Sequence, residues 1–178
     1  TITSGGGAVA INGIIGAGSN GALGNVAINN TNTSDTGAIT LAGIGSGTTS
    51  SNAGIVGTVN IGSDKTSTLT LGGTTYNTDG STSYQSITGS DKILITGTDP
   101  VFTTHDDTIA FSTGGIKLTA GEFEVQSGGN GITIDGRIVG NSANGGQTES
   151  VKLDAGTGDG TNAVVTLSST TGIGSGDE

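Results

Sequence analysis

The sequence contains no tryptophan, cysteine or methionine, and aromatic residues make up only 3% of it. The absence of cysteine excludes a disulfide scaffold. A globular domain of 178 residues would normally use more large apolar side chains to fill its core. An ordered chain of this composition therefore needs a narrow interior that smaller side chains can fill.

Basic residues are also scarce, since five Lys and Arg stand against 15 Asp and Glu and the net charge is −10. Binding to nucleic acid or to an anionic membrane surface draws mainly on Lys and Arg, so we expect neither partner. No apolar run approaches the roughly 20 residues that a transmembrane helix requires. No apolar leader precedes the strand pattern at Thr1, so we expect a mature, processed or excised chain.

The abundant residues are Gly, Thr, Ser and Asn, with Ile, Val and Leu placed at alternate positions between them. Such a composition by itself would allow disorder. Short alternating segments, however, recur from one end of the chain to the other, and this period of two predicts β-strands. Separate strands are expected at 83–87 and 92–96, for example, and no stretch has a helical period.

The chain contains an internal repeat, because residues 1–47 resemble residues 124–176. The offset between matching positions grows slowly, from 123 residues at Ile11 and Ile134 to 129 residues at Ile44 and Ile173. The string GIGSG at 43–47 returns unchanged at 172–176. We interpret 1–178 as a single segment of a repetitive array.

Apolar anchors in the centre of the chain are separated by 7, 9, 7, 7 and 9 residues, at Ile95, Phe102, Phe111, Leu118, Val125 and Ile134. Each step leaves room for a strand of three or four residues and a bend. A parallel β-helix with three short strands and roughly 20 to 25 residues per coil satisfies this spacing. An antiparallel β-sandwich also satisfies it, but strands this short make poor independent hairpins.

The strand-and-turn phrases GAITLAG, STLTLGG, NGITIDGRIVG and ESVKLDAGTGDG extend over nearly the whole chain. They resemble the filamentous-haemagglutinin-like and autotransporter-like β-helix repeats of large bacterial surface proteins. The resemblance implies a right-handed parallel β-helix at the cell surface that serves in adhesion, as a stalk or in extracellular filaments. It implies no catalytic residue.

Candidate metal ligands are carboxylates in turns: Asp106 with Asp107, and Asp154 with Asp159. Carboxylate oxygens among flexible glycines suit Ca²⁺, so calcium is the one cofactor that the sequence suggests. The only histidine, His105, precedes the first pair. A metal ligand or general base is one interpretation of His105, and an exposed polar turn residue is the other.

Some β-helices cleave polysaccharides with paired carboxylates. Such sites usually display aromatic and basic side chains, and this chain offers two Tyr, three Phe and the single Arg137. Tyr76 and Tyr84 could contact a ligand or a neighbouring subunit, or could form a cross-strand pair.

We therefore predict a non-enzymatic, extracellular or cell-surface segment of a fibre, adhesin stalk or surface layer. Its partners would be further copies of the same β-helix, stacked end to end through matching edges, with a glycan or another cell-surface ligand as a further possibility. Two alternatives stay open: a carbohydrate-binding or carbohydrate-cleaving β-helix of the tailspike kind, and a β-sandwich filament subunit joined by strand donation.

Overall fold

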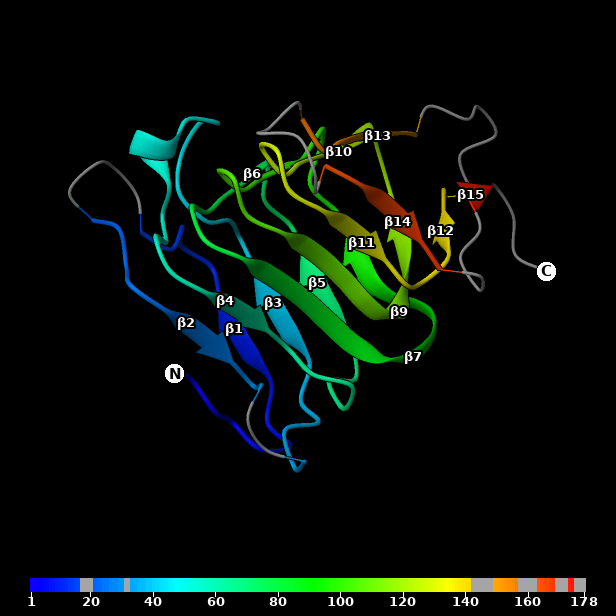
Figure 1. The fold of residues 1–178 in the computed structure, drawn as a ribbon. Helices are drawn as coiled ribbons and strands as arrows, with labels where there is room; N and C mark the ends of the chain where they lie inside the picture. Colours follow the sequence, from blue (N-terminus) through cyan, green and yellow to red (C-terminus); the bar gives the residue numbers. More distant parts are fainter. Residues whose placement is uncertain (17–20, 31–32, 142–148, 157–162, 169–172, 175–178) are drawn as a thin grey trace.

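A computed structural model describes residues 1–16, 21–30, 33–141, 149–156, 163–168 and 173–174. In these residues the chain is nearly all β and winds into a β-solenoid of about five turns, which confirms the predicted fold class (Figure 1). The strands are β1 (Val9–Ile11), β2 (Val26–Ile28), β3 (Ile39–Leu41), β4 (Val59–Ile61), β5 (Leu69–Leu71), β6 (Thr75–Asn77), β7 (Thr82–Ile95), β8 (Val101–Thr103), β9 (Ile109–Leu118), β10 (Glu122–Gln126), β11 (Ile132–Ile134), β12 (Ile138–Val139), β13 (Ser150–Asp154), β14 (Val165–Leu167) and β15 (Ile173–Gly174). One 3-10 turn, η1 (Ser50–Asn52), is also present.

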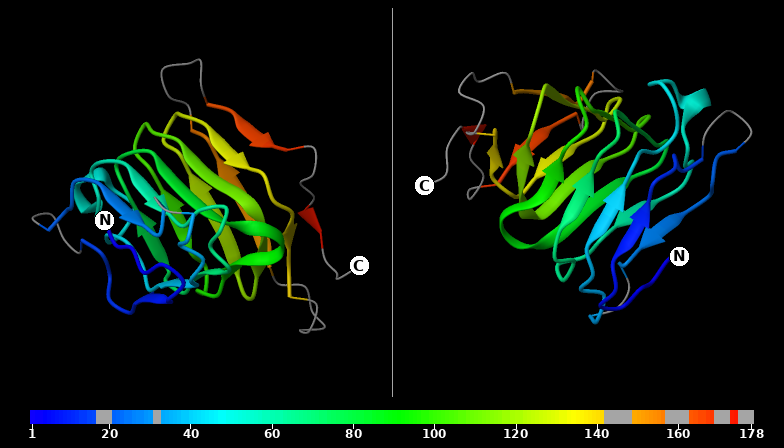
Figure 2. Two further views of the ribbon diagram at one scale, coloured as in Figure 1. Left: turned by 90° about the horizontal axis from the view of Figure 1, so that it is seen from below. Right: turned by 180° about the vertical axis from the view of Figure 1, so that it is seen from behind.

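The strands form three faces, which the chain visits in a fixed order, and every strand pair is parallel. Face A contains β1, β3, β5, the end of β7, the end of β9, β12 and β15. Face B contains β6, β8, β10 and β13. Face C contains β2, β4, the start of β7, the start of β9, β11 and β14. The colours of Figure 2 follow this winding from one end of the solenoid to the other.

The length of each turn can be measured along face C, where the first inward-facing residues are Val26, Val59, Thr82, Ile109, Ile132 and Val165. Successive turns take 33, 23, 27, 23 and 33 residues. The two shortest turns agree with the predicted 20 to 25 residues. The first long turn accommodates the loop that carries η1, in a stretch rich in Gly, Ser and Thr.

Two strands are longer than the sequence predicted. The expected strands 83–87 and 92–96 are one 14-residue strand, β7, which continues from face C around the corner onto face A. β9 makes the same passage over 10 residues, and the two strands pair with register shifts around Gly89, whose φ is +142°. An extended chain can round a solenoid corner at such a bulge, so the predicted break between strands is wrong there.

The core is a set of ladders of inward-facing residues, one residue per turn. On face C, for example, Ile61, Tyr84, Phe111 and Ile134 follow one another at no more than 1% exposure. Outward-facing neighbours on the same strands are Thr, Ser, Asn or Ala. The alternation in the sequence therefore places its aliphatic residues inside, as the period of two requires.

All five aromatic residues of the chain lie in this interior and contact one another. The rings of Tyr76 and Phe102 on face B stack at a centroid distance of 4.4 Å, and those of Tyr84 and Phe111 on face C stack at 5.0 Å. The two stacks meet edge to face between Phe102 and Phe111, at 5.3 Å. Aromatic contacts thus join two faces of the solenoid in its central turns.

Glycines of consecutive turns stack at the corners between faces. A Cβ added to Gly97, between faces A and B, would lie 2.0 Å from the carbonyl oxygen of Gly73 one turn below. A Cβ added to Gly136, between faces C and A, would lie 2.1 Å from the carbonyl oxygen of Gly114. Much of the glycine content is therefore explained by backbones that approach too closely for a side chain.

Candidate functional site

The first candidate site is an apolar hollow at the N-terminal end of the solenoid, with a volume of about 270 Å³. Its lining residues are Thr1, Ile2, Ile11, Ile15, Leu23, Asn25, Val26, Ala27 and Ile28, and none of these side chains is Asp, Glu, Lys or Arg. The hollow forms where the inward ladders of the three faces begin. Ile2 and Leu23 remain 44% and 47% exposed there, although inward-facing ladder residues in the central turns are buried.

The opposite end of the solenoid has the same character. Val165 and Leu167 of β14 are 38% and 43% exposed, although their ladder neighbours Ile132 and Ile134 are completely buried. Val151 and Leu153 of β13 are partly buried and pack against the core. Both ends therefore present the aliphatic edge of a turn that could be covered by a further turn of the same kind.

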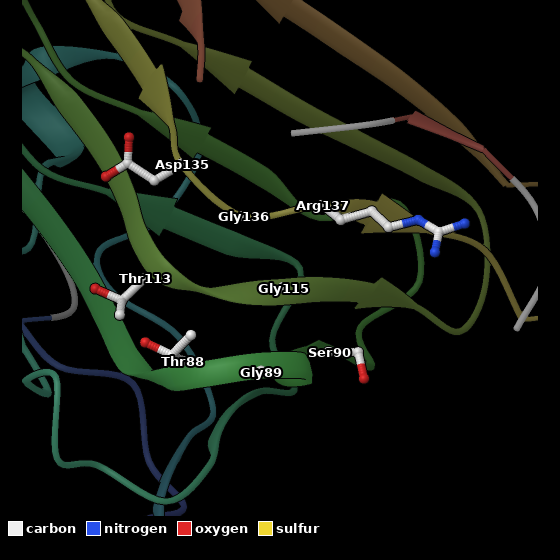
Figure 3. A pocket seen from close by; sticks show the side chains of 8 residues that line it. All are labelled: Thr88, Gly89, Ser90, Thr113, Gly115, Asp135, Gly136 and Arg137. Carbon is white, nitrogen blue, oxygen red and sulfur yellow. The ribbon is translucent and has the colours of Figure 1, made fainter. Parts of the chain in front are cut away.

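The second candidate site is a polar groove of about 290 Å³ at the corner between faces C and A. It is assembled from three successive turns and is lined by Thr88, Gly89, Ser90, Thr113, Gly115, Asp135, Gly136 and Arg137. Figure 3 shows Asp135 and Arg137 directed away from each other above glycine backbone. Hydroxyl groups and exposed backbone could bind a small polar ligand here, but Asp135 is the only carboxylate among the lining residues.

The sequence did not predict this groove. Its polar side chains come from three short segments, around residues 89, 113 and 136, which are more than 20 residues apart along the chain and become neighbours only through the stacking of turns. The only local signal was the set of glycines at 89, 114–115 and 136, which mark the corner.

His105 lies in the turn between β8 and β9 and has a structural partner. Its Nε2 donates a hydrogen bond of 2.9 Å to Oδ1 of Asn77, a completely buried residue. The amide nitrogen of Asn77 in turn donates to the carbonyl oxygens of Ser46 and Thr49, in the loop that carries η1. This contact joins His105 to the corner one turn below and gives the imidazole a structural role.

The predicted calcium ligands do not meet in the described part of the chain. Asp106 and Asp107 lie in the turn after β8, and Oδ1 of Asp107 accepts a hydrogen bond of 2.7 Å from Ser81. Asp154 ends β13, and its Oδ1 accepts a hydrogen bond of 2.8 Å from the N–H of Gly156. Asp159 lies outside the described residues.

These turns stack at one corner, but another turn separates them. Gly128 packs on the backbone of Asp106, and Gly156 packs on Gly129. Asp154 is therefore two turns away from the Asp106 turn, or about 10 Å along the axis, whereas Ca²⁺ needs oxygens at about 2.3 to 2.6 Å. Among the described residues, no three His, Cys, Asp or Glu side chains form a group that could hold a metal ion. Calcium binding stays a prediction.

Tyr76 and Tyr84 are about 1% exposed, so the interpretation that they contact a ligand at the surface is wrong. The Tyr76 hydroxyl accepts a hydrogen bond from the N–H of Gly73 and donates one to the carbonyl oxygen of Leu41. Burial raises the pKa of Tyr76 to about 12, against a smaller lowering by the Gly73 hydrogen bond. Burial also raises the pKa of Tyr84 well above its usual value. Both phenols are neutral parts of the core.

Outward-facing charges are concentrated on face B near the C-terminal end. Glu124 of β10 pairs with Lys152 of β13, one turn above. The hydrogen bond from Lys152 lowers the pKa of the Glu124 carboxyl, and the same contact raises the pKa of the lysine. Lys152 is about half exposed, whereas Glu124 is mostly covered. Solvent reaches the lysine side of this cross-strand pair and screens it, so we expect it to contribute little to stability.

Asp35 is a residue that sequence reasoning missed. It lies between β2 and β3 and is completely buried, and neither of its carboxylate oxygens has a hydrogen-bond partner among the residues that the structure describes. An aspartate in a Ser-Asp-Thr-Gly stretch is typical of an exposed turn, so nothing in the sequence indicates its burial.

We expect Asp35→Asn to increase the free energy of unfolding by about 1 to 3 kcal/mol, because a neutral amide costs less to bury than a carboxyl group whose oxygens have no partner among the described residues. Urea denaturation at neutral pH, followed by circular dichroism, measures the effect. Asp64→Asn is the matched control: Asp64 is exposed and pairs only with Lys65, so its loss should change stability by less than about 0.5 kcal/mol. An Asp35→Asn variant no more stable than the parent would contradict the expectation.

Among the described residues, no helix has the length and apolar character needed to span a bilayer. Comparison with protein families, with curated proteins and with solved structures found no match to this chain.

Proposed function

We propose that this chain is a non-enzymatic structural segment of an extracellular fibre, adhesin stalk or surface layer, and that copies of it stack end to end. The β-solenoid fold supports this function, because parallel hydrogen-bonded ladders run along the whole axis and give stiffness without a wide core. A segment of this kind could contact a glycan or another surface ligand through the polar groove at the corner between faces C and A.

The observation that carries the proposal is the exposure of aliphatic ladder residues at both ends. Ile2 and Leu23 at one end, and Val165 and Leu167 at the other, occupy positions that are buried in the central turns. Edge strands with unpaired backbone groups and apolar side chains recruit further strands. A head-to-tail contact between different ends does not close on itself, so its repetition gives a filament.

Charge also favours contact through the ends. The chain carries a net charge of −10, which opposes the approach of two copies along most of the surface. The hollow at the N-terminal end is lined without acidic or basic side chains. Association there gains apolar burial, and the side chains that line this hollow add no charge of their own to the repulsion between copies.

Leu167→Lys tests this proposal. Covering Leu167 with a second copy would stabilise the contact by about 1.5 to 3 kcal/mol, and a lysine would instead place a charge inside it. We expect the variant to raise the dissociation constant for self-association at least about tenfold. Sedimentation velocity over a range of concentrations measures this change, and electron microscopy of concentrated protein should show fibres with an axial spacing of about 4.8 Å.

Thr166→Lys is the matched control, because Thr166 lies on the same strand but faces outward. It introduces the same charge and should leave association nearly unchanged. A parent chain that remains monomeric at millimolar concentration would overturn end-to-end stacking of separate copies, and equal effects of the two lysines would show that the ladder position is not in the contact.

A further inference from the structure

The two stretches that resemble each other in sequence, 1–47 and 124–176, lie on different faces of the solenoid. β1 is on face A, whereas its counterpart β11 is on face C. β2 is on face C, whereas its counterpart β13 is on face B. β3 is on face A, whereas its counterpart β14 is on face C. Every pair is displaced by one face in the same direction, so the sequence pattern recurs after a whole number of turns plus two thirds of a turn.

The order in which the chain visits the three faces at its first and last described strands leads independently to the same displacement by one face. The chain visits faces A, B and C in turn, and its last described strands are β14 on face C and β15 on face A. The next strand along this path would lie on face B, over β13. The first paired residue of the chain, Ile2, pairs with Ile28 and so belongs to face C of its own copy. A second copy can continue the path without a gap only if its face C follows face B of the first.

We propose that consecutive copies in the stack are rotated by one face, about 120°, about the solenoid axis. This inference rests on the proposed end-to-end function and specifies its geometry. In the rotated arrangement Ile2 of the second copy covers β13, and β1 of the second copy covers β14. Val9 and Ile11 then lie over Val165 and Leu167, so aliphatic residues meet aliphatic residues.

The unrotated arrangement is less favourable. It places Ile2 over β14 and β1 over β15, and none of the described strands then covers β13. Val151 and Leu153 are partly buried at this edge and would then have no turn of the second copy above them. The backbone N–H and C=O groups of β13 on that side would have no strand of the second copy to pair with. Unpaired backbone groups enclosed at an interface cost free energy comparable to lost hydrogen bonds.

The rotation sets the dimensions and the surface of the fibre. From Ile2 the chain makes one turn to β2 and about five more turns to β14. The next copy begins two faces later, which is two thirds of a turn. At 4.8 Å per turn, the rise is therefore about 32 Å per copy. The loop with η1, which stands out from the solenoid in Figure 1, would recur on each of the three sides in succession. Every third copy would present it in the same direction.

Engineered disulfides distinguish the two arrangements, and the absence of natural cysteine makes the result unambiguous. In the rotated stack Ala10 of β1 lies beside Thr166 of β14, and in the unrotated stack Ala10 lies beside Gly174 of β15. Paired parallel strands lie about 4.8 Å apart, so facing residues have Cα atoms within the range of about 4.4 to 6.8 Å that a disulfide requires. The two members of each pair are at opposite ends of one chain, so a bond between them must join two copies.

We expect the double variant A10C/T166C, oxidised gently at a concentration where the parent associates, to form a ladder of covalent oligomers on non-reducing gels. A10C/G174C should form at least about tenfold less, and the single-cysteine variants should stop at dimers. Circular dichroism of each reduced variant checks that the fold is retained. Both A10C and T166C replace exposed residues.

The outcomes separate this inference from the proposed function. A ladder from A10C/G174C in place of A10C/T166C overturns the rotation and leaves end-to-end stacking intact. No ladder from either pair, in protein that still associates through Leu167, also overturns the rotation. A parent chain that does not associate overturns the stacking of separate copies, and the rotation with it.

Discussion

Phe102→Ala is expected to lower the free energy of unfolding by about 3 to 5 kcal/mol. Phe102 is completely buried, and its ring lies within 5.4 Å of four other rings, those of Tyr76, Tyr84, Phe111 and Phe123. Truncation removes the contacts that Phe102 makes across to Tyr84 and Phe111 on face C. A narrow interior with hydrogen-bonded walls cannot collapse far to fill the cavity. Guanidinium denaturation followed by circular dichroism measures the loss.

Val101→Ala on the same strand is the control for Phe102→Ala. Val101 precedes Phe102, faces away from the aromatic interior and is only partly buried. Its truncation should cost less than about 1 kcal/mol. If the two substitutions lower the free energy of unfolding by the same small amount, the aromatic cluster does not stabilise the central turns. Because a solenoid can unfold in parts, the denaturation slope should be compared as well as the midpoint.

Gly97→Ala is expected to destabilise the chain by about 3 kcal/mol, although it adds a single methyl group. The new Cβ would lie 2.0 Å from the carbonyl oxygen of Gly73 and 3.3 Å from that of Gly72. Because both contacts are with backbone, no side-chain rotation can relieve them, and the two turns must move apart at the corner between faces A and B. The hydrogen bonds of the neighbouring ladders would lengthen in consequence.

Gly72→Ala is the matched control at the same corner. A Cβ at Gly72 would meet nothing closer than Oγ1 of Thr96, at 3.4 Å, and Gly72 does not have a positive φ. This substitution should be neutral or slightly stabilising, by up to about 1 kcal/mol, because it restricts the unfolded chain. Thermal melting of both variants measures the difference. Similar melting temperatures for the two would contradict the account of the stacked corner glycines.

Much of the fold could be predicted because its period is short. The alternation of Ile, Val and Leu with Thr and Ser determines which side chains point inward. The anchor spacing of 7 to 9 residues gives the number of residues in one face of the solenoid and the bend that follows it. The scarcity of large side chains indicated a narrow interior. These features depend only on neighbouring residues, and local geometry decides them.

The breaks between strands were harder to predict. The Gly-Ser-Asp stretch after Thr88 is typical of a turn, yet β7 continues through it. Pairing with β9 on the adjacent turn supplies hydrogen bonds that the sequence does not reveal. Tertiary pairing can override local turn preference in this way.

Burial of polar residues was also decided by the tertiary structure. Thr104 and Ser127 are completely buried at a corner, and their hydroxyls donate to the carbonyl oxygens of Asp107 and Asn130 in their own turns. Each hydroxyl also lies within 3.4 Å of a carbonyl oxygen on the turn stacked above, that of Ser127 for Thr104 and that of Ala155 for Ser127. Within the described part of the chain, Asp35 is buried without such partners. From sequence alone the three residues are equally typical of exposed turns, and only the turn stacked beside each one distinguishes them.

The sequence by itself determined that this chain is all β and that it has a small aliphatic interior, because both properties follow from residues that are close in the chain. It also revealed the repeat, because comparing two stretches of sequence requires no knowledge of how they are placed in space. Only the tertiary structure decided which residues share a face, which glycines lie under a neighbouring backbone, and where the polar groove and the two open ends lie. These properties depend on the number of residues in each turn, which varies from 23 to 33. A change of a few residues in a loop leaves the strand pattern intact but changes which distant side chains become neighbours.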